Sequence, residues 1–342
     1  MAGHRAADQT AVRDVVLQTV SAGQRNLAKL IQDEFKVSRA TAHNYLQSMI
    51  EAGDITRLRP GSYALAHTEN QYFHQIDGLH EDQVWRNEIF PNLSDLPKNV
   101  REIWEYGCTE MINNAIDHSE SEGVTITVDR TALKTKVDVY DTGVGIFRKI
   151  AEALGLEEDR HAVLELAKGK VTTDPDNHTG EGIFFSSRTF DEYVIHSEGV
   201  MFHHDDKDGL DWVLGDEHRR EDGLGTSVTM RLANDSTKSL TSIFDEYATD
   251  DEDYGFSRTV VPVKLLAYGD DRLVSRSQAR RLLSRFDRFK MVVLNFDQVE
   301  SIGQAFADEV FRVFATRHPE IELVGVRANE QVTRMINRAK SD

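Results

Sequence analysis

The sequence is short of the residues that cross-link a chain or anchor it in a membrane. Its 342 residues include a single cysteine, Cys108, so neither an intramolecular disulfide nor a cysteine-rich zinc site is possible. No apolar run approaches the roughly 18 residues that span a bilayer, and the N-terminus has no apolar signal region. We therefore expect a cytoplasmic protein of two or three domains that does not bind membranes.

Basic residues are scarce as well. The chain has 40 Lys and Arg against 58 Asp and Glu, a net charge of −18, which disfavours diffuse binding to nucleic acid. Residues 1–66 depart from this average, because their eight basic and six acidic residues give a net charge of +2 and leave −20 for the rest. Only this N-terminal segment is a candidate for binding DNA.

Three helical patterns and two short strands fill the N-terminal segment. The helices are expected at 10–22, 24–35 and 39–52, and the strands flank Pro60-Gly61 within 55–65. Ser38 is a typical N-cap for the third helix, and the short turn before it is the signature of a helix-turn-helix. Residues 1–66 therefore resemble a winged helix-turn-helix domain.

The winged-helix interpretation assigns DNA contacts to five residues. Arg39, Thr41 and His43 would lead the recognition helix into the major groove, while Arg57 and Arg59 on the wing would face phosphates. Winged helices also act as protein-docking or dimerising modules, and this one is only weakly basic. Both interpretations stay open.

The rest of the chain is organised around a helix that contains the stretch 110–118. Glu110 and Asn114 lie one turn apart on one stripe of this helix, together with Asp117 or His118. An amide oxygen can bind Mg²⁺, and a carboxylate can orient a water. The opposite stripe is apolar and can pack on a sheet, and it consists of Cys108, Ile112, Ala115 and Ile116.

Three glycine-containing motifs follow this helix in order. Asp141-Thr-Gly-Val-Gly145 comes directly after residues 136–140, whose alternating pattern predicts a strand. Gly180-Glu-Gly182 opens another apolar run, and Gly225-Thr226 precedes a last strand. Each motif alone is weak, but the ordered set is specific.

Together these motifs resemble the four boxes of the GHKL superfamily of ATP-binding domains, which includes gyrase and the histidine kinases. The resemblance covers roughly residues 97–233 and implies an ATP domain at 97–235. It further implies an α/β sandwich, in which helices cover one face of a mixed sheet.

The resemblance also implies a role for each matching residue. Glu110 would be the general base that orients the attacking water, and Asn114 would be the Mg²⁺ ligand. Asp141 would accept a hydrogen bond from the adenine amino group, with Thr226 beside it. The glycines that would let the backbone approach the nucleotide are Gly143, Gly145, Gly180 and Gly182.

Residues 147–179 form a long insertion between two of these boxes. Its polar end, with glycine and proline, is typical of a mobile lid at a phosphate site. Lys168 and Lys170 are candidates for contacting the γ-phosphate, and solvent-exposed lysines are the equally weighted alternative.

Two segments are expected to be linkers. Residues 67–96 are expected to form a helical linker with solvated histidines, because Gly78, Pro91 and Pro97 exclude the long helical hairpin of a phospho-accepting histidine. Residues 236–258 are expected to form an acidic linker around Asp250-Asp-Glu-Asp253.

The remaining segment, 259–342, alternates strands with helices, which predicts a small α/β domain. Ser275 and Gln278 are spaced as a capping box for its first helix. The expected strands are 259–266, 291–296 and 321–326, and the expected helices are 276–286, 305–317 and 330–340.

Residues 292–303 and the helix after them resemble the centre of STAS domains, the fold of anti-sigma-factor antagonists. Those antagonists carry a phosphorylated Ser or Thr after the strand, whereas this chain has Gly303-Gln-Ala-Phe306, with Ser301 nearby. The resemblance implies a protein-docking domain and leaves phosphorylation at this position in doubt.

Three functions are compatible with this sequence. The first is a regulator in which ATP and Mg²⁺ binding, with slow hydrolysis and possible dimerisation, switches DNA or protein binding. The second is a serine or threonine kinase of the anti-sigma-factor type. The third is an interaction module that binds nucleotide without turnover.

Overall fold

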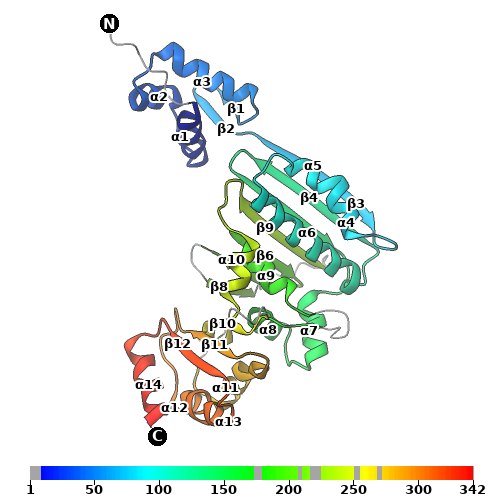
Figure 1. The fold of residues 1–342 in the computed structure, drawn as a ribbon, viewed down its shortest axis with the longest axis vertical. Helices are drawn as coiled ribbons and strands as arrows, with labels where there is room; N and C mark the ends of the chain where they lie inside the picture. Colours follow the sequence, from blue (N-terminus) through cyan, green and yellow to red (C-terminus); the bar gives the residue numbers. More distant parts are fainter. Residues whose placement is uncertain are drawn as a thin grey trace.

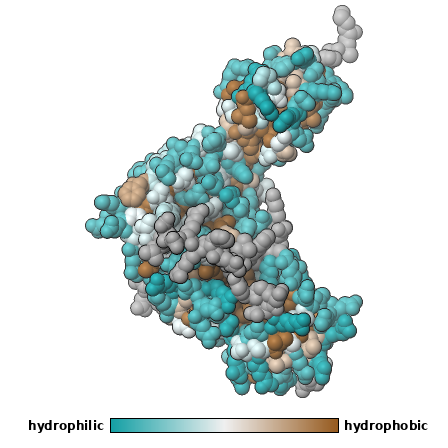
Figure 2. Space-filling view, turned by 180° about the vertical axis from the view of Figure 1, so that it is seen from behind, coloured by the Kyte–Doolittle hydropathy of each residue, from teal (hydrophilic) through white to brown (hydrophobic). Residues whose placement is uncertain are grey.

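The structure is a computed structural model that describes residues 9–172, 179–206, 210–215, 225–249, 255–267 and 272–341. Within these residues the strands form sheets of two, seven and three strands. The sheets belong to three successive parts of the chain, which appear as three lobes in Figures 1 and 2. The protein is therefore a multidomain α/β protein.

The N-terminal part contains the three helices and two strands that its sequence predicts. They are α1 (Gln9–Ser21), α2 (Leu27–Phe35), α3 (Arg39–Glu51), β1 (Ile55–Arg59) and β2 (Ser62–Leu65). The hydroxyl of Ser38 accepts a hydrogen bond from the backbone N–H of Thr41 at 3.1 Å, so the expected N-cap is present. The strands pair as an antiparallel hairpin, and the helices bury a core of their own.

The central sheet has the order β3-β4-β5-β9-β6-β7-β8. Its strands are β3 (His67–Gln75), β4 (Gly123–Thr131), β5 (Lys134–Asp141), β6 (Glu192–Ser197), β7 (Val200–Asp205), β8 (Leu210–Gly215) and β9 (Thr226–Ala233). Every neighbouring pair is antiparallel, so the expectation of a mixed sheet was wrong. The long helical connection between β5 and β6 allows these two strands to run in the same direction. They are not neighbours, however, because β9 lies between them and is antiparallel to both.

The expected linker at 67–96 is largely part of the central domain. All nine residues of β3 pair with β4, and the side chain of His74 contacts Glu88 at 2.8 Å. The side chains of β3 are mostly polar and exposed, so the strand shows no hydrophobic pattern in the sequence. As an edge strand, it is held in the sheet by backbone hydrogen bonds. The helical turns after it are α4 (Glu81–Val84), the π-helical η1 (Trp85–Ile89) and α5 (Phe90–Leu93).

Helix α6 (Lys98–His118) packs across one face of the central sheet (Figure 1). Cys108, Ile112 and Ala115 of α6 are buried in the core beneath it, as the apolar stripe predicts, and Ile116 is partly buried. A helix thus covers this face of the central sheet, as expected. The sheet contributes alternate residues of β4 and β5 to the same core, and these include Val124, Ile126, Val137 and Val139.

Among the described residues, three further helices lie between β5 and β6, and another follows β9. They are α7 (Ile146–Leu154), α8 (His161–Lys168), α9 (Gly182–Thr189) and α10 (Leu240–Glu246). Helix α10 lies in the expected acidic linker and buries Ile243, so this segment is partly structured. The acidic run at 250–253 lies outside the described residues.

The C-terminal part is a three-stranded parallel sheet covered by helices, as its alternating pattern predicts. The order of elements is β10 (Arg258–Pro262), η2 (Val263–Leu266), α11 (Arg276–Leu283), η3 (Phe286–Arg288), β11 (Met291–Asn295), α12 (Gln304–Asp308), η4 (Glu309–Phe314), α13 (Ala315–Arg317), β12 (Glu322–Val326) and α14 (Glu330–Ser341). Ser275 and Gln278 form the expected capping box. Strand β10 ends earlier than expected, at Pro262, which has no N–H to donate to a neighbouring strand.

None of the helices in the described ranges is long and apolar enough to cross a membrane.

Candidate functional site

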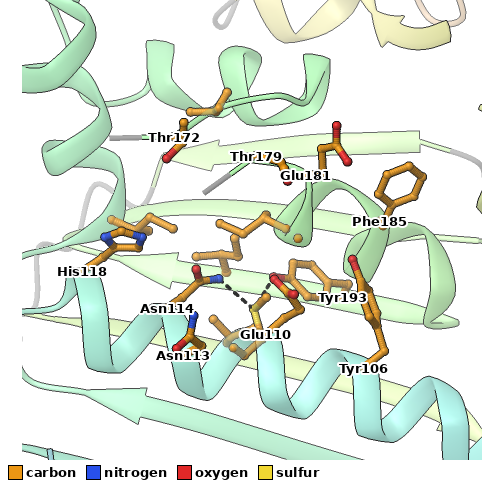
Figure 3. Close-up of a pocket in the computed structure, with 18 of the residues that line it drawn as sticks. Tyr106, Glu110, Asn113, Asn114, His118, Thr172, Thr179, Glu181, Phe185 and Tyr193 are labelled. Carbon is orange, nitrogen blue, oxygen red and sulfur yellow. Dashed lines mark hydrogen bonds between the residues drawn. The ribbon is translucent and has the colours of Figure 1, made fainter. Parts of the chain in front are cut away.

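A cavity of about 1080 Å³ lies between α6, the ends of β5, β6 and β9, and the helices α7, α9 and α10. Figure 3 shows part of its lining, with α6 along one wall and the first turn of α9 opposite. This volume is slightly above the usual range for small-molecule sites, which is roughly 300–1,000 Å³. The cavity brings together segments that are far apart in the sequence.

Helix α6 contributes one row of polar side chains to the cavity. Glu110, Asn114 and His118 line it, as the helical spacing predicts, whereas Asp117 is exposed elsewhere. Asn113 also lines the cavity (Figure 3), although the sequence analysis did not select it. The amide nitrogen of Asn114 contacts the sulfur of Met111 at 4.0 Å, which orients the amide at the cavity wall.

Asp141 and Thr226 lie at the end of the cavity formed by β5 and β9. They are paired across the ladder, and both are almost fully buried. The carboxylate of Asp141 accepts a hydrogen bond from the backbone N–H of Gly143 at 2.9 Å, and the hydroxyl of Thr226 accepts one from Ile146 at 3.1 Å. Burial raises the pKa of Asp141, and hydrogen bonds from the N–H groups of Gly143 and Thr226 partly oppose this shift.

The glycines of the motifs are placed in two ways. Gly180 and Gly182 line the cavity, whereas Gly143 and Gly145 flank Val144, which does. Gly180 has a φ of +72°, and an added Cβ would collide with the backbone of Val171. Glycine is required there, because both the conformation and the close approach exclude a side chain.

The first turn of α9 lies against the carboxylate of Glu110 at the cavity wall (Figure 3). Gly182 is the first residue of this helix, and an added Cβ would collide with the Glu110 carboxylate. Glu181 and Ile183 line the cavity on either side of it. The N-terminus of a helix presents backbone N–H groups and a partial positive charge, so this wall can bind an anion such as phosphate.

The two lysines expected at the γ-phosphate do not line the described part of the cavity. Lys168 is fully buried, and its ammonium contacts Glu165 at 2.6 Å and the carbonyls of Arg281 and Ser284 at 3.0 Å each. Lys170 donates to the carbonyl of Arg288 at 3.0 Å. Both side chains therefore point to the C-terminal domain, because that domain supplies carbonyl acceptors the sequence does not reveal.

The charge of the described lining is acidic. The described lining contains four acidic residues, which are Glu110, Asp141, Glu181 and Asp245. Lys149 is the only Lys or Arg among the described lining residues. Lys149 donates to the carbonyl of His118 at 2.7 Å and to Glu120 at 2.9 Å. A polyphosphate on such a wall would require a cation that accompanies it.

Two tyrosines near Glu110, Tyr106 and Tyr193, also line the cavity, and sequence reasoning missed both. Burial is the main cause that raises the pKa of Tyr106, and the charges of Glu110 and Glu181 add to it. Tyr193 is fully buried and donates to the sulfur of Met111 at 3.0 Å. Tyr106 lies one turn before Glu110, so the helical spacing was a signal that could have identified it.

The lining includes polar side chains that could hold a nucleotide and an accompanying Mg²⁺. Mg²⁺ retains several waters and commonly takes one or two protein ligands beside phosphate oxygens. The amide of Asn114 could supply one ligand, and the described residues contain no cluster of three or more metal-binding side chains that would hold an ion alone. Asp141 could hold a base amino group at the other end.

The five candidate DNA contacts lie in the N-terminal part. Arg39, His43, Arg57 and Arg59 are exposed. Thr41 is half-buried, and its hydroxyl pairs with the hydroxyl of the N-cap residue at 2.9 Å. Further exposed polar residues of α3 were not selected, and they include Asn44 and Gln47.

Comparison with known families identifies one part of the chain. Residues 278–333 match the family described as a STAS-like domain of unknown function (DUF4325). The C-terminal part of the chain is therefore STAS-like, in agreement with the resemblance of residues 292–303. No curated protein matches the chain.

Proposed function

We propose that the protein is an ATP-binding regulator whose central part is a GHKL-type domain. The observation that supports this proposal is the position of Asp141, buried at one end of a cavity that Glu110 and Asn114 also line. A carboxylate in this position can select a base with an exocyclic amino group. The first turn of α9 at the other end can hold phosphate.

The residues of the cavity would divide the work in the following way. Asp141 would accept a hydrogen bond from the adenine amino group, while Asn114 would supply an oxygen ligand to Mg²⁺. The cation, when bound, neutralises phosphate charge and orients the phosphates. Glu110 faces the same helix N-terminus, where it would orient an attacking water and accept its proton.

The proposal extends to the two flanking parts. The N-terminal part would be a winged helix that binds DNA, and the STAS-like part would dock on protein. A direct chain connection supports coupling between them, because only Ala66 separates β2 of the wing from β3 of the central sheet. A change in the central domain can therefore be transmitted to the wing.

The test is a nucleotide-binding and hydrolysis assay combined with a mass measurement in each nucleotide state. The regulator hypothesis expects ATP binding, slow phosphate release without an acceptor protein, and a different DNA affinity or mass with ATP than with ADP. Absence of any adenine nucleotide binding in the full chain would contradict the proposal.

A kinase of the anti-sigma-factor type is the second candidate, because a STAS-like domain occurs in the same chain. The positions of the usual acceptor, Gly303 to Phe306, carry no hydroxyl, so the substrate would be another protein. Phosphoprotein that forms only with an added acceptor would favour this candidate. Tight ATP binding with neither product would favour a non-hydrolysing interaction module.

A further inference from the structure

Side chains of the STAS-like domain bind the segment 165–170 of the central domain, which leads into the cavity. The guanidinium of Arg285 contacts the carboxylate of Glu165 at 2.9 Å and the carbonyl of Gly169 at 3.2 Å, and it also donates to the carbonyl of Lys170. Arg288 donates to that same carbonyl at 2.9 Å. One side chain of the C-terminal domain thus holds a carboxylate and two consecutive carbonyls of the central domain.

The chain continues from this segment directly into the wall of the cavity. Val171 and Thr172 line it, and the N–H of Val171 donates to the carbonyl of Gly180 at 3.0 Å. Gly180 is followed after one residue by Gly182, the start of α9. A displacement of the Lys170 carbonyl would therefore move the part of the cavity that the proposed function assigns to phosphate.

The aromatic side chains of α9 strengthen the same connection. Phe184 packs against Phe256 with ring centroids 4.4 Å apart, and Phe256 packs against Phe289 of the C-terminal domain at 5.3 Å. Lys170 lies over the rings of Phe256 and Phe289, with its ammonium 5.5 and 5.1 Å from their centroids. The helix that faces Glu110 is thus packed into the core cluster of the C-terminal domain.

Backbone conformations show that the side chains at this contact outweigh local preference. Lys170 has a φ of +54° and Arg285 a φ of +65°, both in the left-handed region that favours glycine. Such residues persist where the surrounding contacts determine their conformation. Glycine would adopt the left-handed backbone conformation at position 285 with less strain than arginine. The arginine is therefore explained by the contacts that its side chain makes.

We propose that Arg285 is a positioning residue for the cavity, through which the STAS-like domain sets the geometry of the phosphate-binding end. This inference rests on the proposed nucleotide function. Because binding free energies are reciprocal, a bound triphosphate strengthens the docking of the STAS-like domain by the same factor by which docking strengthens triphosphate binding. The domain is then a sensor of nucleotide state within its own chain.

The test compares ATP and adenosine binding by calorimetry in the full chain and its variants. In Arg285→Gln we expect ATP affinity to fall roughly tenfold or more, the equivalent of one hydrogen bond to a charged group. Adenosine affinity should stay within about twofold, a small free-energy change, because adenosine has no phosphate and Asp141 is at the other end of the cavity. Equal losses for both ligands, or no loss for either, would overturn the proposal.

Two more variants separate positioning from folding. Arg285→Gly removes the same contacts but suits the left-handed backbone, and Glu165 keeps Lys168 as its partner, so it should fold and show the same selective loss of ATP affinity. Arg280→Gln is the matched control, since Arg280 is on the adjoining helix, is 69% exposed and pairs with Glu309 of its own domain. It should bind both ligands like the parent.

Hydrogen exchange gives a readout that does not depend on ATP. Without ligand, Arg285→Gln should exchange faster than the parent at 169–172 and 180–185, whereas Arg280→Gln should not. If the parent binds neither ATP nor adenosine, the proposed function fails, and faster exchange still supports the positioning role. Unchanged exchange in both segments would reject Arg285 as a positioning residue, whatever the ligand.

Discussion

Asp141 and Thr226 face each other at the ends of β5 and β9, and each holds the turn after Asp141 by a different backbone N–H. The aspartate accepts from Gly143 and the threonine accepts from Ile146. The turn that begins α7 is therefore fixed to the same two residues that line the end of the cavity. A base bound at this end would contact the same two residues that hold this turn.

Asp141→Asn should weaken ATP binding. The amide cannot replace the carboxylate as an acceptor of equal strength, and the loss of a hydrogen bond to a charged group costs about 1.5–3 kcal/mol. Calorimetric titration with ATP measures this directly. Asp138→Asn on the same strand is the control, because Asp138 pairs with Lys136 and Thr229 and does not line the cavity. An Asp141→Asn variant with parental affinity would remove Asp141 from the site.

Glu110 and Asn114 should differ in what they affect. Glu110→Ala should retain ATP binding and lose hydrolysis by roughly 10²–10⁴-fold, the typical contribution of a general base. Asn114→Ala should instead lose the Mg²⁺-dependent part of ATP affinity. Phosphate release measures the hydrolysis rate, and ATP titrations with and without Mg²⁺ measure the Mg²⁺-dependent affinity. The control is Asp117→Ala, because Asp117 is exposed on the same helix. Hydrolysis at the parental rate in Glu110→Ala would mean that another residue is the base.

Lys168 should make stability depend on pH. Its pKa is lowered from 10.5 to about 8, mainly because the side chain is buried; Glu165 opposes this shift, and the nearby charge of Arg285 adds to it. Between these values the unfolded chain binds the proton and the folded chain does not, so folding stability rises with pH in this window. The folded state bears the cost of the buried ammonium below about pH 8.

Urea unfolding of the parent and of Lys168→Met at several pH values measures this dependence. From pH 8 to pH 10.5 the parent should gain stability relative to the variant, by at most about 3 kcal/mol. Lys98→Met is the control, because the side chain of Lys98 is 82% exposed. A constant difference between the parent and Lys168→Met over this range would contradict the lowered pKa.

DNA binding, if the N-terminal part provides it, should be weakened by salt. Replacing Arg57 and Arg59 by Gln should lower affinity about equally for all duplex sequences and reduce the salt dependence, as expected for phosphate contacts. Changes at Arg39 or His43 should instead alter sequence preference. Gel-shift titrations at two salt concentrations, with and without ATP, test both expectations.

The control for the Arg57 and Arg59 variants is Arg334→Gln, which changes the charge at a remote, 78% exposed side chain. Residues 1–66 alone should bind duplex more tightly than the full chain at low salt, because the remainder carries −20. If neither the full chain nor this fragment shows salt-sensitive binding, the N-terminal part is better interpreted as a protein-docking module.

Local pattern was sufficient for several elements. The polar and apolar stripes of α6 follow from residue spacing alone, so Glu110 and Asn114 could be selected together before any contact was known. The Ser38 cap and the Ser275 capping box are likewise local, because they depend on residues three positions apart. The alternation of strands and helices predicted the C-terminal domain for the same reason.

Non-local contacts were needed for the rest. Strand β3 has few apolar residues, and only its pairing with β4 makes it part of the sheet. The insertion of β9 between β5 and β6 makes the sheet antiparallel, and no periodic pattern carries strand order or direction.

The lysines show the limit most directly. The sequence by itself determined that Lys168 and Lys170 stand in an insertion between two glycine motifs, near a candidate phosphate site. Only the tertiary structure decided where they point, because their partners are carbonyls and aromatic rings far along the chain, including those of Arg288 and Phe256. A long, flexible side chain takes the direction of the best acceptor in space, and that acceptor is set by how the domains pack.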